Sequence, residues 1–173
     1  NTITRTDVGV YSVVIPGMPK ESQTQVTTES ENGERCSLAN TVSVTGTRAT
    51  EHTVRCFAIG GEPADIGFSL LQYEGGLVTP SAYVWANEPG SEAYTPDTRY
   101  QFNSNGGEIT ISRIADGTYN VNLPGQGTES GNVQISAANS GPGVSCELER
   151  WSLGDDDLKT IQVYCFDSAG TRI

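Results

Sequence analysis

The amino-terminal sequence of this chain occurs a second time further along the same chain. Residues 1–17 and residues 109–125 align without a gap at an offset of 108 positions. A period that is found twice indicates one folding unit used twice. Eight of the seventeen positions are identical: Thr2, Ile3, Arg5, Gly9, Tyr11, Val13, Pro16 and Gly17 return as Thr110, Ile111, Arg113, Gly117, Tyr119, Val121, Pro124 and Gly125.

The repeat continues as far as the cysteines. Cys36 matches Cys146 and Cys56 matches Cys165, while the segment 62–108 occurs only once. The chain therefore holds one complete period and part of another. We expect a first β-repeat at 1–76 that lacks its first two strands, a linker at 77–81, and a second β-repeat at 82–173 that lacks its last strand.

The residue pattern predicts an all-β fold. Hydrophobic residues make up 35% of the chain and lie in short alternating runs, which favours β-structure with many turns over disorder. No long window has the apolar spacing of an amphipathic helix, so we expect little or no helix. About eight short strands per period are typical of an antiparallel sandwich, and we predict two Ig-like or Greek-key modules in tandem. The predicted strands of one period are 82–86, 100–102, 108–114, 118–123, 132–137, 145–151, 161–167 and 68–73.

Tight turns are marked by recurring glycine. Gly117 ends the turn segment Ala115–Gly117 and Gly9 ends the equivalent segment Asp7–Gly9, each between alternating runs. We predict a positive φ angle at both positions, because a tight hairpin requires it and glycine adopts it without steric cost. The proline-containing segment Tyr94–Asp97 is also predicted to be a turn.

The four cysteines fall two per repeat, with separations of 20 and 19 residues. Each pair brackets a predicted turn, and residues equidistant from a hairpin turn face each other within reach of a disulfide. We predict the disulfides Cys36–Cys56 and Cys146–Cys165, which imply a secreted, extracellular or cell-surface location. Free buried thiols are the alternative, and the spacing does not suit a zinc site.

The charge of the chain limits its partners. The formal net charge is −11 and the basic residues are scattered, which disfavours nucleic acid and anionic membrane surfaces. No apolar run approaches the ~20 residues of a membrane-spanning helix. The chain begins with Asn1 and has no signal-peptide pattern, so we expect a processed or excised form.

Several motifs together resemble those of a known group of proteins. They are the Tyr-X-Val-X-Leu/Ile-Pro-Gly run at 11–17, the Cys-Phe pair at 56–57, the Ala-Tyr-Val-Trp-Ala-Asn run at 82–87 and the Tyr-X-Phe-Asn-Ser run at 100–104. The chain resembles tandem disulfide-containing β-repeats of uncharacterised secreted bacterial proteins. That resemblance implies a secreted repeat module with no assigned activity and no functional residues. The first copy departs from the pattern at Thr41, where the second has Trp151.

Catalytic chemistry has little support in the sequence. His52 is the single histidine, its counterpart in the second copy is not histidine, and we expect it to be a solvated turn residue. The carboxylates are dispersed, although a glycosidase pair can come from distant strands. No phosphate-binding glycine loop has the required strand-to-helix context. We therefore predict that the chain is not an enzyme and carries no cofactor.

Two groups of residues are candidates for binding a ligand. Asp155, Asp156 and Asp157 at a hairpin tip are a candidate for Ca²⁺ binding, with an exposed charged turn as the alternative. Aromatic residues that could stack on a sugar, or that could instead fill a core, are Trp85, Tyr94, Tyr100 and Trp151.

These features favour an extracellular structural or adhesive repeat protein. An incomplete module exposes a sheet edge, and native proteins cover such edges. We expect either a longer array of repeats or head-to-tail assembly into filaments by strand complementation. Self-association or contact with neighbouring repeats is therefore the expected partnership, with a glycan or a cell surface as a further partner. The alternative functions are a lectin-like carbohydrate-binding module or an accessory domain of a secreted hydrolase.

Overall fold

The computed structural model describes residues 1–19, 22–74, 80–138, 141–155 and 157–173. These residues form an all-β fold, as predicted, with one short 3₁₀ turn at Thr98–Tyr100. They fall into two compact units. Unit 1 contains Asn1–Glu74, Ser136–Ser145 and Phe166–Thr171, and unit 2 contains Gly75–Ile135, Cys146–Cys165 and Arg172–Ile173.

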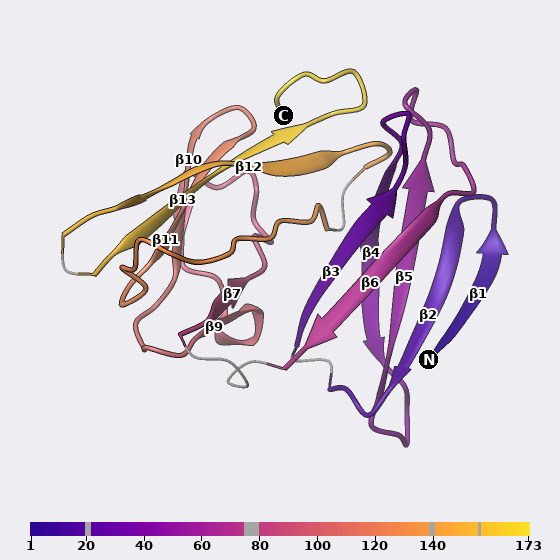
Figure 1. The fold of residues 1–173 in the computed structure, drawn as a ribbon, viewed down its shortest axis with the longest axis horizontal. Coiled ribbons are helices and arrows are strands. Elements are labelled where there is room, and N and C mark those ends of the chain that lie inside the picture. The colour runs from indigo at the N-terminus through magenta and orange to yellow at the C-terminus, as the bar shows by residue number, and fades with distance from the viewer. Residues whose placement is uncertain (20–21, 75–79, 139–140, 156) are drawn as a thin grey trace. The chain divides into compact units, whose positions relative to one another are not determined.

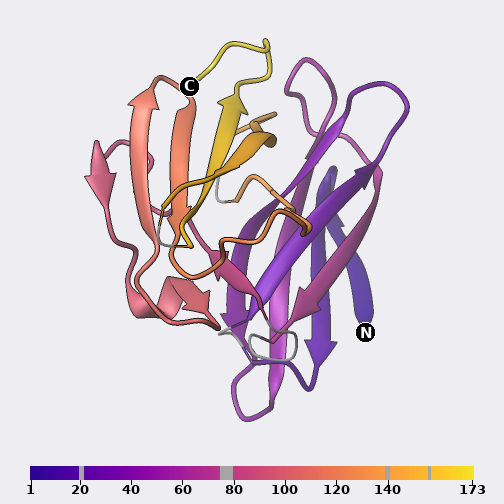
Figure 2. The ribbon, with the colours of Figure 1, turned by 60° about the vertical axis from the view of Figure 1, so that its left-hand side comes forward.

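Unit 1 is built from two antiparallel sheets. The four-stranded sheet has the order β1-β2-β5-β4, and β3 pairs with β6 in a separate ribbon that lies across one face of that sheet (Figures 1 and 2). The strands are β1 (Thr2–Asp7), β2 (Val10–Pro16), β3 (Gln23–Glu29), β4 (Arg35–Ser43), β5 (Ala49–Phe57) and β6 (Gly67–Tyr73).

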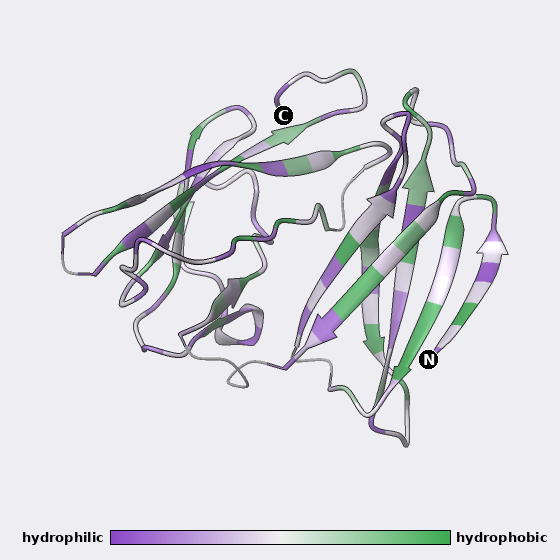
Figure 3. Ribbon diagram, viewed as in Figure 1, coloured by the Kyte–Doolittle hydropathy of each residue, from purple (hydrophilic) through white to green (hydrophobic). Residues whose placement is uncertain are grey.

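The core of unit 1 lies between the sheet and the ribbon. Val13, Val54 and Cys56 of the sheet and Val26 of the ribbon are buried in one cluster. In β6, whose hydropathy is coloured in Figure 3, Phe68 and Leu70 pack against that cluster and the exposed Ser69 lies between them. Such alternation places one face of a strand on the core and the other in solvent.

Unit 2 has a five-stranded sheet of order β12-β13-β11-β10-β8, and Figure 2 shows β10, β11 and β13 side by side. Ile109, Ile111, Tyr119, Val121 and Ile161 form its buried core. A second ribbon pairs β7 with β9. The strands are β7 (Ala82–Val84), β8 (Ala93–Tyr94), β9 (Gln101–Asn103), β10 (Thr110–Ala115), β11 (Thr118–Leu123), β12 (Ser145–Leu153) and β13 (Lys159–Phe166).

The sequence repeat has a structural counterpart. The order β1-β2-β5-β4 in unit 1 corresponds to β10-β11-β13-β12 in unit 2. Ile3 lies opposite Val13, and Ile111 lies opposite Val121. The pairing register shifts at equivalent places in the two hairpins, between Arg5 and Asp7 and between Arg113 and Ala115. The second pairing also matches, because Tyr11 faces Val54 and Tyr119 faces Val163.

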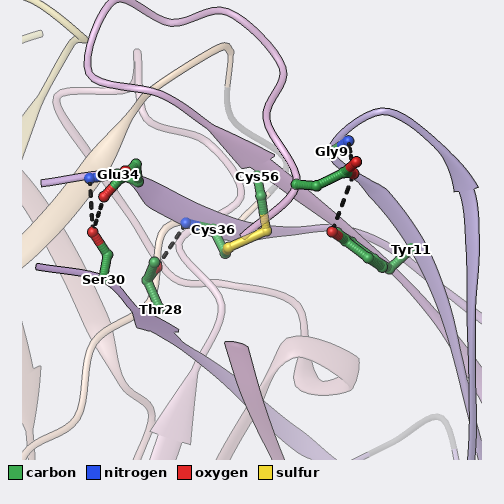
Figure 4. The surroundings of a disulfide bond; sticks show 8 residues. Gly9, Tyr11, Thr28, Ser30, Glu34, Cys36 and Cys56 are labelled. Atoms are coloured by element: carbon green, nitrogen blue, oxygen red, sulfur yellow. Dashed lines mark hydrogen bonds between the residues drawn. A yellow bond between two sulfur atoms is a disulfide. The ribbon is translucent and has the colours of Figure 1, made fainter. Parts of the chain in front are cut away.

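Both predicted disulfides are formed. Cys36 and Cys56 lie directly opposite each other with Cα atoms 4.0 Å apart, and the corresponding distance for Cys146 and Cys165 is 4.1 Å. The Cys36 amide donates to Thr28 Oγ1, which ties β4 to the neighbouring ribbon (Figure 4). Each bridge closes a hairpin and, on the chain-entropy model, stabilises the fold by about 3 kcal/mol.

The structure differs from two sequence-based expectations about secondary structure, and the expected domain boundaries stay a prediction. Residues 132–137 were expected to form a strand, but they have no regular structure, and Ser136 instead bonds to Val26 of unit 1. The predicted turn at Tyr94–Asp97 is wrong at its first residue, because Tyr94 pairs with Ile111 as part of β8. The boundaries 1–76, 77–81 and 82–173 stay a prediction; unit 1 also takes in two later segments, and linker residues 77–79 lie outside the described residues.

Glycine has the predicted positive φ at the tight turn of both copies, +64° at Gly9 and +57° at Gly117. The Gly9 carbonyl accepts the Cys56 amide at 2.8 Å, and the Gly117 carbonyl accepts the Cys165 amide at 2.9 Å. The turn therefore packs directly against the cysteine-bearing strand in each unit.

Gly9→Ala should destabilise unit 1 strongly. A Cβ at this position would lie 2.5 Å from the Cys56 carbonyl oxygen and 2.8 Å from the Ala64 nitrogen. Backbone strain alone costs about 1–3 kcal/mol at such a φ, and the collision adds to it. The control is Gly46→Ala, where φ is +76° and no atom lies within 4 Å of the new Cβ. Urea unfolding should show a clearly larger decrease in the free energy of unfolding for Gly9→Ala than for Gly46→Ala. Equal decreases for the two variants would contradict the proposed packing.

Candidate functional site

The β7–β9 ribbon of unit 2 carries four aromatic residues on one face. Tyr83 lies opposite Phe102, and the Trp85 amide donates to the Tyr100 carbonyl at 2.8 Å, so both pairs are cross-strand neighbours. The Tyr83 and Phe102 rings are stacked with centroids 5.6 Å apart. The Trp85 and Tyr100 rings meet edge to face at 4.8 Å. Alternate residues of a strand point to the same side, so the four rings form one surface, here called the aromatic face.

The opposite side of the ribbon fixes it to unit 2. Ala82 and Val84 pack against the buried cluster around Ile111. Gln101 accepts the Ile109 amide at 2.7 Å through its side-chain oxygen, and its NH₂ group donates to the Pro96 carbonyl. The aromatic face is therefore held in place by the hydrogen bonds of the Gln101 side chain and by the apolar contacts of Ala82 and Val84.

One ion pair borders the aromatic face. Arg99 Nε donates to Asp97 Oδ1 at 2.9 Å, and its guanidinium lies 5.4 Å from the centre of the Tyr100 ring. The hydrogen bond from Arg99 lowers the pKa of the Asp97 carboxyl, and Asp97 in turn raises the pKa of Arg99. Both side chains are exposed, so this pair supplies hydrogen-bonding groups beside the rings at little cost in stability.

The structure brings together two of the four predicted stacking residues. Trp85, which is 38% exposed, meets Tyr100 on the aromatic face. Tyr94 packs against the core, accepts the Glu88 amide, and has a pKa raised by burial. Trp151 on β12 also packs against the core, with the Lys159 ammonium 6.0 Å from its ring. For these two residues, the core-filling alternative fits the structure.

Sequence analysis missed Tyr83 and Phe102 as members of this face. The available signal was the alternation in Ala82-Tyr83-Val84-Trp85 and in Tyr100-Gln101-Phe102. Pairing two alternating runs in an antiparallel register places their aromatic residues on one side.

Unit 1 contains a carboxylate with three donors. Asp65 Oδ1 accepts from Arg5 Nε and from the Gly9 amide, both at 2.9 Å, and from the Tyr11 hydroxyl at 3.2 Å. These bonds lower the pKa of the Asp65 carboxyl to about 2; the Arg5 hydrogen bond has the largest effect and the Gly9 amide the next largest. The cluster ties the β1–β2 hairpin to the chain before β6, which is a structural role.

His52 is not the solvated turn residue that the sequence suggested. It lies within β5 and is fully buried. Its Nδ1 is 3.0 Å from Thr41 Oγ1, and its Nε2 is 3.1 Å from Gln72 Oε1. Burial lowers its pKa, so the imidazole is neutral at physiological pH. A neutral, enclosed and fully hydrogen-bonded histidine fills space in the core and does not face a substrate.

Unfolding of the chain should become easier below pH 6.5 because of His52. Its folded-state pKa lies below the ordinary 6.5, so between those two values the unfolded chain binds a proton that the folded chain excludes. The contribution of His52 to the free energy of unfolding should therefore be largest above pH 6.5. As the pH is lowered from 6.5 to the folded-state pKa, it should decrease by at most about 1.4 kcal/mol per pH unit.

The matched variant for this effect is His52→Gln, which keeps a polar side chain but removes the only histidine of the chain. Urea unfolding followed by circular dichroism at several pH values measures both proteins. The variant should be less stable at neutral pH and should lose the slope just below pH 6.5. The same slope in both proteins would exclude His52 as its source.

The acidic side chains that the structure describes do not form a recognisable metal centre. A shallow depression of about 350 Å³ in unit 1 is lined by Glu29, Glu31, Glu34 and Asp65, but Asp65 is already bound to Arg5. Within the described ranges, no cluster of three His, Cys, Asp or Glu side chains has a metal-binding arrangement. For the Ca²⁺ candidate, Asp155 and Asp157 lie in the β12–β13 turn and Asp156 lies outside the described residues.

Among the described residues, no helix has the length and apolar character needed to cross a membrane. Comparison with known protein families, with curated proteins and with solved structures finds no match for this chain.

Proposed function

We propose that this chain is an extracellular structural or adhesive repeat protein that acts through surface contact and strand-complemented, head-to-tail assembly. One observation carries the proposal: the same four-stranded order, with matching hairpin registers and one disulfide-closed hairpin, occurs in both units. Repeat architectures present extended surfaces and associate through neighbouring units.

The chemistry of the chain supports an extracellular setting. Both disulfides join directly facing strands, and such bonds persist in oxidising compartments. The net charge of −11 keeps copies soluble and slows non-specific association. Under this proposal, assembly depends on backbone pairing between strands and not on charge attraction.

The titratable groups described above also favour contact over catalysis. His52 is enclosed by Thr41 and Gln72, and Asp65 is held by Arg5 and two further donors. Burial lowers the pKa of His52, and the Arg5 hydrogen bond is the largest cause of the lowered pKa of Asp65. A general base must reach a substrate and accept its proton; His52 is enclosed, and the half-exposed Asp65 carboxylate, with a pKa of about 2, is a weak proton acceptor.

Association in solution tests the proposal. Size-exclusion chromatography with light scattering over a range of concentrations should show species larger than one chain, and electron microscopy of concentrated samples should show linear particles. Heterologous contacts that do not close give open filaments. A sharp monomer peak at the highest concentration would contradict assembly.

Glycan binding is a second candidate, favoured by the aromatic face. Trp85 and Tyr100 present ring edges and faces beside the Arg99–Asp97 pair, so apolar stacking and hydrogen bonding are available together. Sites for small polar ligands commonly combine aromatic surface with a few polar groups. An accessory domain of a secreted hydrolase would use the same surface.

Trp85→Ala should weaken glycan binding if this second function holds. Removal of one stacking ring should weaken binding about tenfold or more, because such rings contribute most of the apolar contact. A glycan array followed by calorimetry on any hit measures the loss. Leu153→Ala is the control, since Leu153 is similarly exposed at 42% but lies on β12. No binding to any glycan, or equal binding by both variants, would count against the aromatic face.

A further inference from the structure

The two units differ in the strand that flanks their matching hairpins. In unit 2, β8 pairs antiparallel with β10, with Tyr94 opposite Ile111 and Ala93 opposite Ser112. In unit 1, β1 is the outermost strand of its sheet, and no described strand pairs with its outer edge (Figure 1). The same hairpin is thus seen once with a flanking strand and once without.

The consequence is visible at one pair of equivalent residues. Ile3 and Ile111 occupy the same repeat position and each faces a buried valine across the hairpin, Val13 or Val121. Ile111 is 1% exposed, whereas Ile3 is 61% exposed. Both side chains lie on the core side of their sheet, because directly opposed residues share a face. The difference therefore reflects cover and not the direction of the side chain: in unit 2, Tyr94 of β8 and the β7 residues Ala82 and Val84 pack against the cluster that contains Ile111.

The backbone of β1 is also ready to pair. In unit 2 the Arg113 amide donates to the Glu92 carbonyl at 2.8 Å, at the edge that carries β8. Outward-facing amides recur at every second residue of an antiparallel strand, so in unit 1 those of Ile3 and Arg5 face the open edge. β1 contains no proline or lysine of the kind that protects exposed edges, and the charge of Arg5, which lies on the same face as Ile3, is already paired with Asp65.

We propose that the outer edge of β1 binds an extended segment of another β-repeat chain, with a small residue followed by tyrosine, in the register that β8 adopts on β10. This inference rests on the proposed function and names its contact site. Tyrosine would lie opposite Ile3 and cover it, as Tyr94 covers Ile111. The bound segment adds main-chain hydrogen bonds along β1, and the aromatic ring provides the apolar contact.

A peptide of residues 90–97, which contains Glu92, Ala93 and Tyr94, is the probe for this edge. It is titrated into the whole ¹⁵N-labelled chain and followed by amide chemical shifts. The largest changes should fall on β1, with Ile3 and Arg5 most affected. A peptide carrying Tyr94→Ala should bind about tenfold more weakly, as expected for the loss of one buried tyrosine contact.

Ile3→Thr in the chain should weaken binding of the parent peptide to a similar extent, because it removes the apolar partner and keeps a β-forming residue. Ile59→Thr is the matched control, since Ile59 is also 61% exposed but lies in the loop after β5. The proposed site would be overturned if millimolar peptide caused no chemical-shift changes, or only changes in β10. An equal loss of peptide affinity in Ile3→Thr and Ile59→Thr would also overturn it.

Binding at the outer edge of β1 and self-assembly of the chain can be tested separately. If the parent chain associates and Ile3→Thr associates equally, β1 is not the contact site and the proposed function stands. If the peptide binds β1 but the chain stays monomeric at every concentration, the edge is a binding site and self-assembly is wrong.

Discussion

Each sheet depends on the junction between its tight hairpin turn and its cysteine-bearing strand. In unit 1 the Gly9 carbonyl accepts the Cys56 amide, and the Cys56 carbonyl accepts the Ala64 amide at 3.1 Å. In unit 2 Gly117, Cys165 and Ile173 make the same two bonds. The disulfide fixes this strand to its other neighbour, so one residue joins three segments of chain. This constraint accounts for the identity of the turn glycine and the cysteines between the two copies.

The shared backbone supports two different cores. Thr41 and His52 face each other across β4 and β5, and Gln72 completes their hydrogen bonds. The repeat places Trp151 and Ile161 at the corresponding positions, and both belong to the apolar cluster of unit 2. A buried histidine is tolerated only with partners for both ring nitrogens, whereas the tryptophan–isoleucine pair needs only volume. The disulfide and the glycine turn therefore fix the sheet, and the core residues vary within it.

The sequence was sufficient for features set by local chemistry or by symmetry around a turn. The glycine turns, the strand alternation and both disulfides follow from spacing alone, because facing positions in a hairpin are determined by the turn. Contacts between distant segments could not be obtained in this way. The enclosure of His52 depends on Gln72, 20 residues away, and the aromatic face depends on the pairing of β7 with β9. The alternation along β5 was an available sign that His52 shares a face with Val54 and Cys56, but it could not identify Gln72 as a hydrogen-bond partner.

The segment that occurs only once explains why two copies of one hairpin end in different environments. Residues 62–108 supply β6 to unit 1 and β7, β8 and β9 to unit 2. The ribbon β3–β6 packs on the unit 1 sheet, while in unit 2 the ribbon residues Ala82 and Val84 pack against the core cluster and β8 also pairs with the edge of the sheet. A sheet loses apolar exposure at its face by packing and at its edge by pairing. Ile3, on an edge strand with no described flanking strand, is therefore exposed, whereas Ile111, which has both kinds of cover, is buried, although both isoleucines occupy the same repeat position.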